Sequence, residues 1–293
     1  MGKGRVIQTP FQPDSFEKLG VKRDVLFTDS TDRYTNDIAW THRSDGETDI
    51  YFIANQQRKE RNVMASFRVF FKSPELYDPV TDELTAAPEW RVTGEHMQLP
   101  IHLAPNASLF VIFRKPTRQI RQIDKNKVVV QPVQTLEGPW QVQFDTTYGG
   151  PEQQQTFAQL TDWSQSADSS IRYYSGTATY TKTFTWSSTG SKRVWLDLGR
   201  IANVANVTLN GVSCGTVWTA PYRIDISKFL RSGQNRLAIN VSNTWANRLI
   251  GDQRLPESKR ITRTTAPFRL QGKPLLEAGL LGPVRIMTKD LQD

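Results

Sequence analysis

Cysteine and histidine are scarce in this sequence, and their scarcity excludes several kinds of site. The 293 residues include one cysteine, Cys214, and three histidines, His42, His96 and His102. A single cysteine can form neither an intramolecular disulfide nor a cysteine-ligated metal cluster. Three scattered histidines provide little for a histidine zinc site. We therefore expect a protein that needs no cofactor.

Long apolar runs are also absent. Hydrophobic residues make up 38% of the chain, and no run approaches the roughly 20 residues that span a bilayer. Residues 1–5 lack the apolar core of a signal peptide, which fits a cytoplasmic protein, a mature form or part of a longer chain. An aromatic content of 10%, with eight Trp, is too high for a disordered chain. The length leaves room for two ordinary domains.

The charge is unbalanced toward basic residues. Lys and Arg exceed Asp and Glu by 37 − 29 = +8, and the isoelectric point is about 9.6. Such a field favours polyanions, namely nucleic acid, anionic lipid or acidic polysaccharide. Residues 114–127 hold six basic residues and one Asp, and we interpret residues 118–127 as an exposed basic connector. A nucleic-acid arm is disfavoured there because no aromatic residues alternate with the charges.

The periodic segments have a period of two, which is typical of strands. Residues 49–54 follow a turn at residues 44–46, and residues 205–209 lead into Asn210-Gly211, a strong hairpin signal. Helical patterns are confined to residues 14–20 and a turn at residues 157–163. Several short strands at short spacing predict an all-β protein, built as a sandwich or a jelly roll. Further strands are predicted at residues 63–71, 108–114, 173–184, 193–199, 214–218 and 236–243.

Hydrolase motifs are weak or incomplete. Residues 211–215 match G-x-S-x-G, but no histidine follows Ser213 and the predicted hairpin is not the strand-to-helix elbow that a nucleophile needs. The acidic residues form no recognisable catalytic pair for glycoside hydrolysis. No run of strand–helix units predicts a complete barrel. We therefore assign no catalytic residue and no metal ligand.

Aromatic and planar polar residues at predicted strand ends suggest a sugar site. Residues 245–252 follow a strand predicted to end at Asn243, and we expect them to form a loop at one end of the sandwich. Sugars stack their C–H faces on aromatic rings and bind planar polar groups through their hydroxyls. In this hypothesis Trp245 stacks on the sugar, Arg248 offers a fork of donors, and Asp252 orients Arg248 or accepts from a hydroxyl. A core Trp with an Arg–Asp pair is the structural alternative. The candidate carbohydrate-binding residues are Tyr173, Tyr174, Trp218, Tyr222, Trp245, Asn247, Arg248 and Asp252.

Residues 195–243 resemble the sugar-binding domain of family 2 glycoside hydrolases, a galactose-binding-like jelly roll. The Leu-Asn-Gly hairpin and the Gly-x-Asn-x-Leu turn recur across that domain family. The resemblance implies a jelly-roll β-sandwich, and such modules often hold a structural calcium, although no acidic cluster marks one here. The matching pieces are Tyr174-Ser175-Gly176, residues 196–199 and 205–211, Ala220-Pro221-Tyr222, residues 233–237 and Val241-Ser242-Asn243.

Nearly the whole chain resembles the C-terminal, non-barrel region of family 106 α-L-rhamnosidase-like glycoside hydrolases. The resemblance implies a barrel-adjacent segment and small β-sandwich in residues 1–117 and a jelly roll in residues 128–293. In that family the catalytic carboxylates lie in an N-terminal barrel, so none is carried onto this chain. The matching pieces are residues 2–6, 42–43, 49–55, 75–81, 138–144, 247–252, 255–256 and 279–284.

Three functions follow from this resemblance. The leading one is an accessory carbohydrate-binding region of a rhamnosidase-like glycoside hydrolase acting on plant-type polysaccharide, with acidic polysaccharide favoured by the charge. The implied partners are carbohydrate and an upstream catalytic barrel in a longer parent chain, without nucleic acid or a membrane span. The implied location is periplasmic or extracellular. The alternatives are a glycoside hydrolase active in its own right and a purely structural buttress for a barrel.

Overall fold

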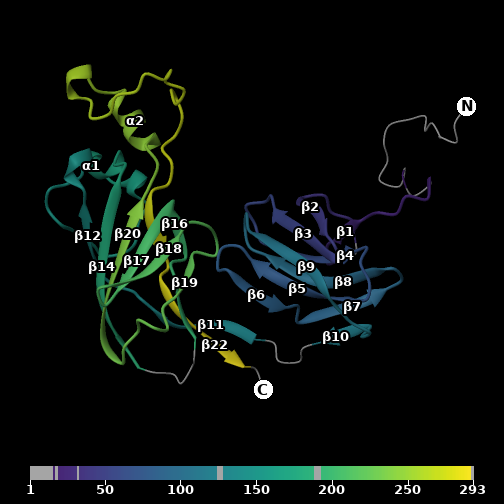
Figure 1. The fold of residues 1–293 in the computed structure, drawn as a ribbon. Coiled ribbons are helices and arrows are strands. Elements are labelled where there is room, and N and C mark those ends of the chain that lie inside the picture. Colours follow the sequence, from purple (N-terminus) through teal and green to yellow (C-terminus); the bar gives the residue numbers. More distant parts are fainter. Residues whose placement is uncertain (1–15, 17–18, 32, 124–127, 188–192, 292–293) are drawn as a thin grey trace, which may run out of the picture. The chain divides into compact units, whose positions relative to one another are not determined.

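The computed structural model describes residues 16, 19–31, 33–123, 128–187 and 193–291, and the chain divides into two compact units, residues 1–125 and 126–293. The first unit contains two five-stranded antiparallel sheets (Figure 1). Their strand orders are β1-β4-β8-β7-β10 and β2-β3-β9-β5-β6. The strands are β1 (Val25–Thr28), β2 (Ile38–Asp45), β3 (Thr48–Asn55), β4 (Arg61–Phe67), β5 (Lys72–Asp78), β6 (Glu83–Ala86), β7 (Glu89–Thr93), β8 (His96–Leu103), β9 (Ser108–Pro116) and β10 (Arg121–Ile123).

The second unit contains a six-stranded sheet, β13-β12-β14-β20-β17-β18, a four-stranded sheet, β11-β22-β15-β19, and the pair β16-β21. Its strands are β11 (Val128–Thr135), β12 (Trp140–Phe144), β13 (Gln155–Phe157), β14 (Thr177–Trp186), β15 (Val194–Asp197), β16 (Arg200–Ala202), β17 (Val204–Leu209), β18 (Val212–Val217), β19 (Arg223–Asp225), β20 (Gly233–Ser242), β21 (Gly279–Gly282) and β22 (Arg285–Leu291). Its helices are α1 (Ser169–Arg172) and α2 (Ala246–Asp252), with 3-10 turns at Thr146–Tyr148, Trp163–Gln165 and Glu257–Lys259.

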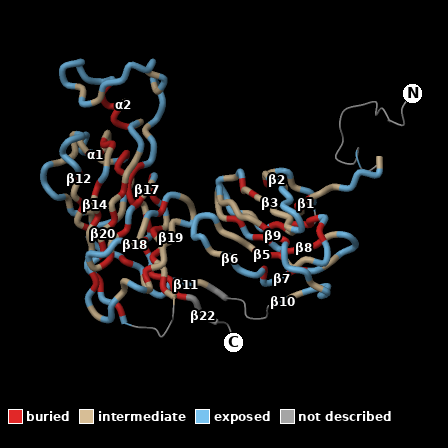
Figure 2. Tube along the Cα trace, viewed as in Figure 1, coloured by how far each residue is buried: buried red, intermediate tan, exposed pale blue. Residues whose placement is uncertain are grey.

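Each unit has its own apolar core, which Figure 2 shows as buried segments along the strands. The period of two explains this: in β20, Asn235, Leu237, Ile239 and Val241 are buried while the residues between them are more exposed. The predicted all-β class, with two successive sandwiches, is confirmed.

The predicted hairpin at Asn210-Gly211 is also present. These two residues have φ angles of 54° and 81° and connect β17 to β18, as a two-residue hairpin turn with positive φ at both positions requires. Ser213 lies on the returning strand opposite Thr208. It therefore lies within a β-hairpin and not at a strand-to-helix elbow.

Two local predictions are wrong. Residues 157–163 do not form a helical turn, because Phe157 ends β13 opposite Trp140 and the turn begins only at Trp163. The side chain of Asp162 caps that turn by accepting from the Ser164 amide. Residues 245–252 were expected to be a loop, but they form α2, which two buried polar side chains described below attach to the following segment. Most of the helix predicted at residues 14–20 lies outside the described residues.

Part of the segment predicted to be a basic connector is a strand. Within residues 118–127, Arg121–Ile123 form β10 and pair with β7. This stretch therefore belongs to the first unit, whose boundary falls at Lys125. Residues 124–127 lie outside the described part of the chain.

An ion-paired glutamate links β5 to β9 in the first unit. The Glu75 side chain is 4% exposed, and its oxygens lie 2.7 Å from Arg114 Nε and 2.7 Å from Lys115 Nζ. Burial alone would raise the pKa of Glu75, but the hydrogen bonds from Arg114 and Lys115 lower it below its usual value of 4.5. A lowered pKa stabilises the fold above pH 4.5, and this stabilisation is lost as the pH falls through the pKa of the folded state.

We therefore expect Glu75→Gln to lower the free energy of unfolding by about 1–2 kcal/mol at pH 7, since both partners are partly exposed and can be rehydrated. The difference from the wild type should shrink in thermal melts at pH 3.5. Glu89→Gln, at an exposed position of β7, is the matched control and should change little. An equal deficit of Glu75→Gln at both pH values would contradict the ion-pair argument.

Candidate functional site

The register of the six-stranded sheet brings most of the candidate sugar-binding residues to one end. Thr177 pairs with Ser242, which also pairs with Val204, and the neighbouring Ala205 pairs with Val217. The segments next to these residues therefore lie at the same end of the sheet. They are residues 173–176, residues 243–252 and Trp218, and Figure 1 shows α1 and α2 at this end.

Two of the candidates, Asn247 and Asp252, hold the long segment that follows α2. Asn247 Nδ2 donates to the Leu276 carbonyl at 2.7 Å, and its Oδ1 accepts from the Leu276 amide at 2.8 Å. Asp252 Oδ2 accepts from the amides of Ile261 and Thr262 and from the Thr262 hydroxyl, at 3.1, 2.7 and 2.6 Å. Both side chains are at most 2% exposed. They are positioning residues for the segment and leave no surface for a sugar.

Arg248 lies between them and is incompletely paired. Its Nη1 is 3.7 Å from Asp252 Oδ1, an i,i+4 ion pair too long for a hydrogen bond. Its Nε and Nη2, together with Asp252 Oδ1, are buried without a hydrogen-bond partner among the described residues. Burial lowers the pKa of Arg248, and the charge of Asp252 opposes this effect. A buried guanidinium with free donors is costly unless something satisfies them.

Trp245 borders a cavity of about 420 Å³. Its ring is 45% exposed and meets Tyr148 edge to face, with ring centroids 5.0 Å apart. Tyr148 comes from the turn after β12, which the sheet register places beside β14. The cavity thus combines two aromatic rings with hydroxyl and guanidinium groups. Its lining is Tyr148, Trp245, Leu249, Ile261, Thr262, Arg263 and Thr264.

The sequence identified Trp245 but missed Tyr148 and residues 261–264. Tyr148 lies almost one hundred residues upstream, and only the pairing of β12 with β14 and of β14 with β20 brings it to this end. The sequence offers one signal for Tyr148: this aromatic residue precedes Gly149-Gly150, a pair typical of a turn, where an aromatic ring can be exposed.

The remaining aromatic candidates do not line this cavity. Tyr174 is fully buried; its hydroxyl donates to the Thr177 carbonyl at 2.8 Å and accepts from the Asp145 amide at 3.1 Å. Burial raises the pKa of Tyr174 to about 12. Because its ring has no exposed face, Tyr174 is a core residue and cannot stack on a sugar.

Tyr173, Trp218 and Tyr222 have three different surroundings. The Tyr173 hydroxyl accepts from Arg254 Nη1 at 2.7 Å, and the guanidinium of Arg254 also lies 5.4 Å from the ring centroid. Tyr222 is half-buried and packs against the core of the unit. Trp218 follows β18 and is 60% exposed. Of the three, Trp218 has the most open ring.

A larger cavity, of about 550 Å³, lies on the first unit and has a different character. Its charged residues are already paired: Lys22 contacts Glu95, and Arg68 lies 3.5 Å from Asp24. Its one aromatic ring is Phe70. It therefore lacks the aromatic pair of the cavity beside Trp245.

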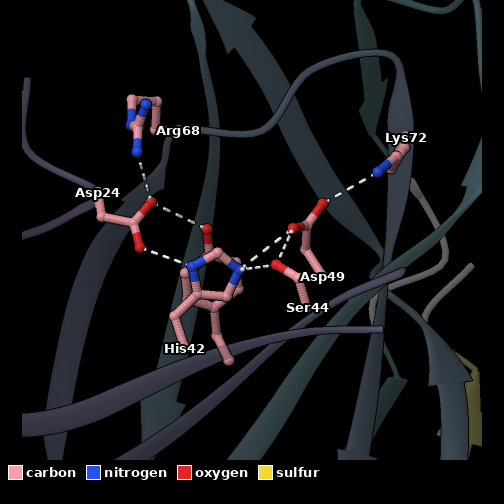
Figure 3. A network of polar contacts seen from close by, with 7 residues as sticks. Asp24, His42, Ser44, Asp49, Arg68 and Lys72 are labelled. Atoms are coloured by element: carbon pink, nitrogen blue, oxygen red, sulfur yellow. Dashed lines mark hydrogen bonds and ion pairs between the residues drawn. The ribbon is translucent and has the colours of Figure 1, made fainter. Parts of the chain in front are cut away.

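His42 is the centre of a polar network in the first unit (Figure 3). Its Nδ1 lies 2.7 Å from Asp24 Oδ2 and its Nε2 lies 3.2 Å from Asp49 Oδ1. Lys72 Nζ donates to the other oxygen of Asp49 at 3.0 Å. Burial would raise the pKa of Asp49, but the hydrogen bonds from Lys72 and His42 lower it. The network joins Asp24, the residue before β1 of one sheet, to β2, β3 and β5 of the other sheet.

Asp24, His42 and Ser44 have the order of an acid–base–nucleophile triad, with Ser44 Oγ 3.4 Å from Nε2. The Ser44 hydroxyl, however, donates to Asp49 Oδ1 at 3.1 Å, and the same oxygen faces Nε2. Asp49 therefore takes the hydrogen bond that an activated nucleophile would give to the histidine. We assign this network a structural role.

Within the described ranges, no three or more His, Cys, Asp or Glu side chains are grouped to hold a metal ion. In the same part of the chain, no helix is long and apolar enough to cross a membrane.

Two family models match separate parts of the sequence. Residues 1–90 match the alpha-L-rhamnosidase model of glycoside hydrolase family 106. Residues 153–272 match the model described as glycosyl hydrolase 2 galactose-binding domain-like. The cavity beside Trp245 lies almost wholly within the second match, apart from Tyr148.

Known proteins are similar over longer stretches. A rhamnosidase structure from Novosphingobium sp. PP1Y is 38% identical, with a TM-score of 0.79, over 94% of this chain and 26% of that one. A Formosa agariphila protein named as a beta-glucuronidase is 38% identical over 55% of this chain and 16% of its own length. The chain thus spans about a quarter or less of these relatives. The resemblance to the non-barrel region of rhamnosidase-like glycoside hydrolases, ending in a galactose-binding-like β-sandwich, is confirmed.

Proposed function

We propose that the second unit binds carbohydrate, and that the chain is the accessory region of a rhamnosidase-like glycoside hydrolase acting on plant-type polysaccharide. The observation that carries this proposal is the cavity beside Trp245. An exposed Trp ring, an adjacent Tyr ring and the polar side chains of Thr262, Arg263 and Thr264 surround a space large enough for one or two sugar rings. Such a mixture of apolar surface and few polar groups is typical of small-ligand sites.

Catalysis would come from an upstream domain of a longer parent chain. The described residues form antiparallel sheets and short helices, and they contain no (β/α)₈ barrel. The similarity to roughly a quarter of a rhamnosidase supports this division of labour. We further propose a periplasmic or extracellular location, where polysaccharide is available, and no cofactor requirement for binding.

The test is to truncate Trp245. We expect Trp245→Ala to weaken binding of rhamnose- and galacturonate-containing oligosaccharides by about 1–3 kcal/mol, the usual cost of removing an aromatic anchor. Isothermal titration calorimetry on the whole chain measures this, and a glycan array identifies the oligosaccharides to titrate. Thermal melts of the same variant should show little change because the ring is 45% exposed.

Trp218→Ala is the matched control, since Trp218 is also exposed and lies at the same end but does not line the cavity. It should leave binding unchanged. Equal losses in both variants would place the sugar elsewhere on this end. Failure of the wild type to bind any glycan would overturn carbohydrate binding and favour the structural buttress.

A further inference from the structure

The wall of the cavity beside Trp245 is positively charged. Arg263 is the one charged residue in its lining, and it has no ion-pair partner among the described residues. Residues 261–264, which form this wall, belong to the longer segment 253–277, which follows α2 in Figure 1 and carries six basic and two acidic residues. One of the two acidic residues, Glu277, is paired with Arg200 at 2.8 Å. The basic residues are Arg254, Lys259, Arg260, Arg263, Arg269 and Lys273.

A second cation lies beneath the same wall. Arg248 Nη2 and the side chain of Ile261, which lines the cavity, both lie beside Gly149, at the position that a Cβ on this glycine would take. The two donors that Arg248 leaves free, Nε and Nη2, form the edge of the guanidinium that binds a carboxylate in bidentate fashion. The nearby carboxylate of Asp252 has one oxygen fully used by three donors from residues 261–262. The carboxylate of Asp252 remains the counter-ion of Arg248, at 3.7 Å, but it leaves the Nε and Nη2 donors of Arg248 without a hydrogen-bond partner among the described residues.

We propose that this cavity selects sugars that carry a carboxylate, namely uronic acids. The proposal rests on the proposed function, since it requires that the cavity bind carbohydrate. Arg263 contacts the carboxylate from the rim while the sugar ring stacks on Trp245. Asp252 is the counter-ion of the buried Arg248, so the net positive charge at the cavity comes from Arg263. No carboxylate in the cavity lining opposes the acidic ligand.

The experiment compares one ligand with and without its charge. Trigalacturonic acid and its fully methyl-esterified form share the same rings and linkages, so they differ only in the carboxylates. Calorimetric titration of the whole chain should show about 10- to 100-fold tighter binding of the acid, the scale of a charged hydrogen bond. Arg263→Gln should weaken binding of the acid about tenfold and leave the affinity for the ester unchanged. The exposed side chain of Arg263 makes this substitution compatible with folding.

Arg236→Gln is the matched control because it removes the same charge from an exposed position of β20, outside the cavity. It should keep the full preference for the acid. Equal affinity for acid and ester, with binding still lost in Trp245→Ala, would overturn the carboxylate preference while leaving carbohydrate binding intact. The same loss in Arg263→Gln and Arg236→Gln would also overturn it, since general charge would then explain the preference. Absence of binding to either trimer and to every other glycan would overturn the proposed function itself.

Discussion

Replacing Gly199 with alanine is expected to lower the free energy of unfolding by about 2–5 kcal/mol, which is a large part of the stability of an ordinary domain. Gly199 has a φ of 65° and forms a bridge to Gly282. A Cβ on Gly199 would lie closer than 3.0 Å to the carbonyl group of Gly282 and to the nitrogen of Pro283. The left-handed backbone costs about 1–2 kcal/mol for alanine, and the clash adds about 1–3 kcal/mol because backbone atoms cannot move aside cheaply.

Urea unfolding followed by circular dichroism measures this loss, and Gly233→Ala is its control. Gly233 has a φ of 86°, but nothing lies within 4 Å of the position its Cβ would take. Its substitution should therefore cost only the backbone contribution, about 1–2 kcal/mol. Equal losses in the two variants would show that the close approach of Gly199 to Gly282 contributes nothing.

This close approach explains why the motif at residues 279–284 could be recognised but not interpreted from the sequence. The strands of strong alternation, such as β14 and β20, and the turn at Asn210-Gly211 depend on local chemistry, so the sequence predicts them. The pairing of β16 with β21 joins residues about eighty positions apart, and the pairing of β11 with β22 joins the two ends of the second unit. No local pattern specifies such partners. The glycines of the motif are explained by that long-range packing.

In the candidate site, too, the sequence predicts what depends on local chemistry and not what depends on long-range packing. Trp245, Arg248 and Asp252 are close in sequence, so their shared location was predictable, although their helix was not. Burial was not predictable, because Tyr174 and Trp245 are both aromatic residues near strand ends. Tyr174 is 0% exposed and Trp245 is 45% exposed. Packing against Phe144 of β12 and Trp163 of the preceding 3-10 turn buries Tyr174, and no local pattern shows which of the neighbouring aromatic rings pack together.

Replacing Asp252 with alanine is expected to be the most damaging change at this end of the second unit. It removes the acceptor of three hydrogen bonds from Ile261 and Thr262, and it leaves the buried charge of Arg248 without its counter-ion. Breaking a buried ion pair from one side costs about 3–5 kcal/mol. Because residues 261–264 form the wall of the cavity, binding of oligosaccharides should be lost as well. Urea unfolding and calorimetric titration on the same preparation measure both effects.

The double variant Arg248→Met, Asp252→Ala separates the two causes. If the unpaired charge of Arg248 dominates, the double variant should be more stable than Asp252→Ala alone, because the methionine side chain fills the space without needing a partner. The coupling between the two positions should then be about 1–3 kcal/mol. Binding should not recover, since the wall of residues 261–264 still lacks its acceptor. A double variant as unstable as the sum of the single variants would instead assign the stability to the three hydrogen bonds and none of it to the ion pair.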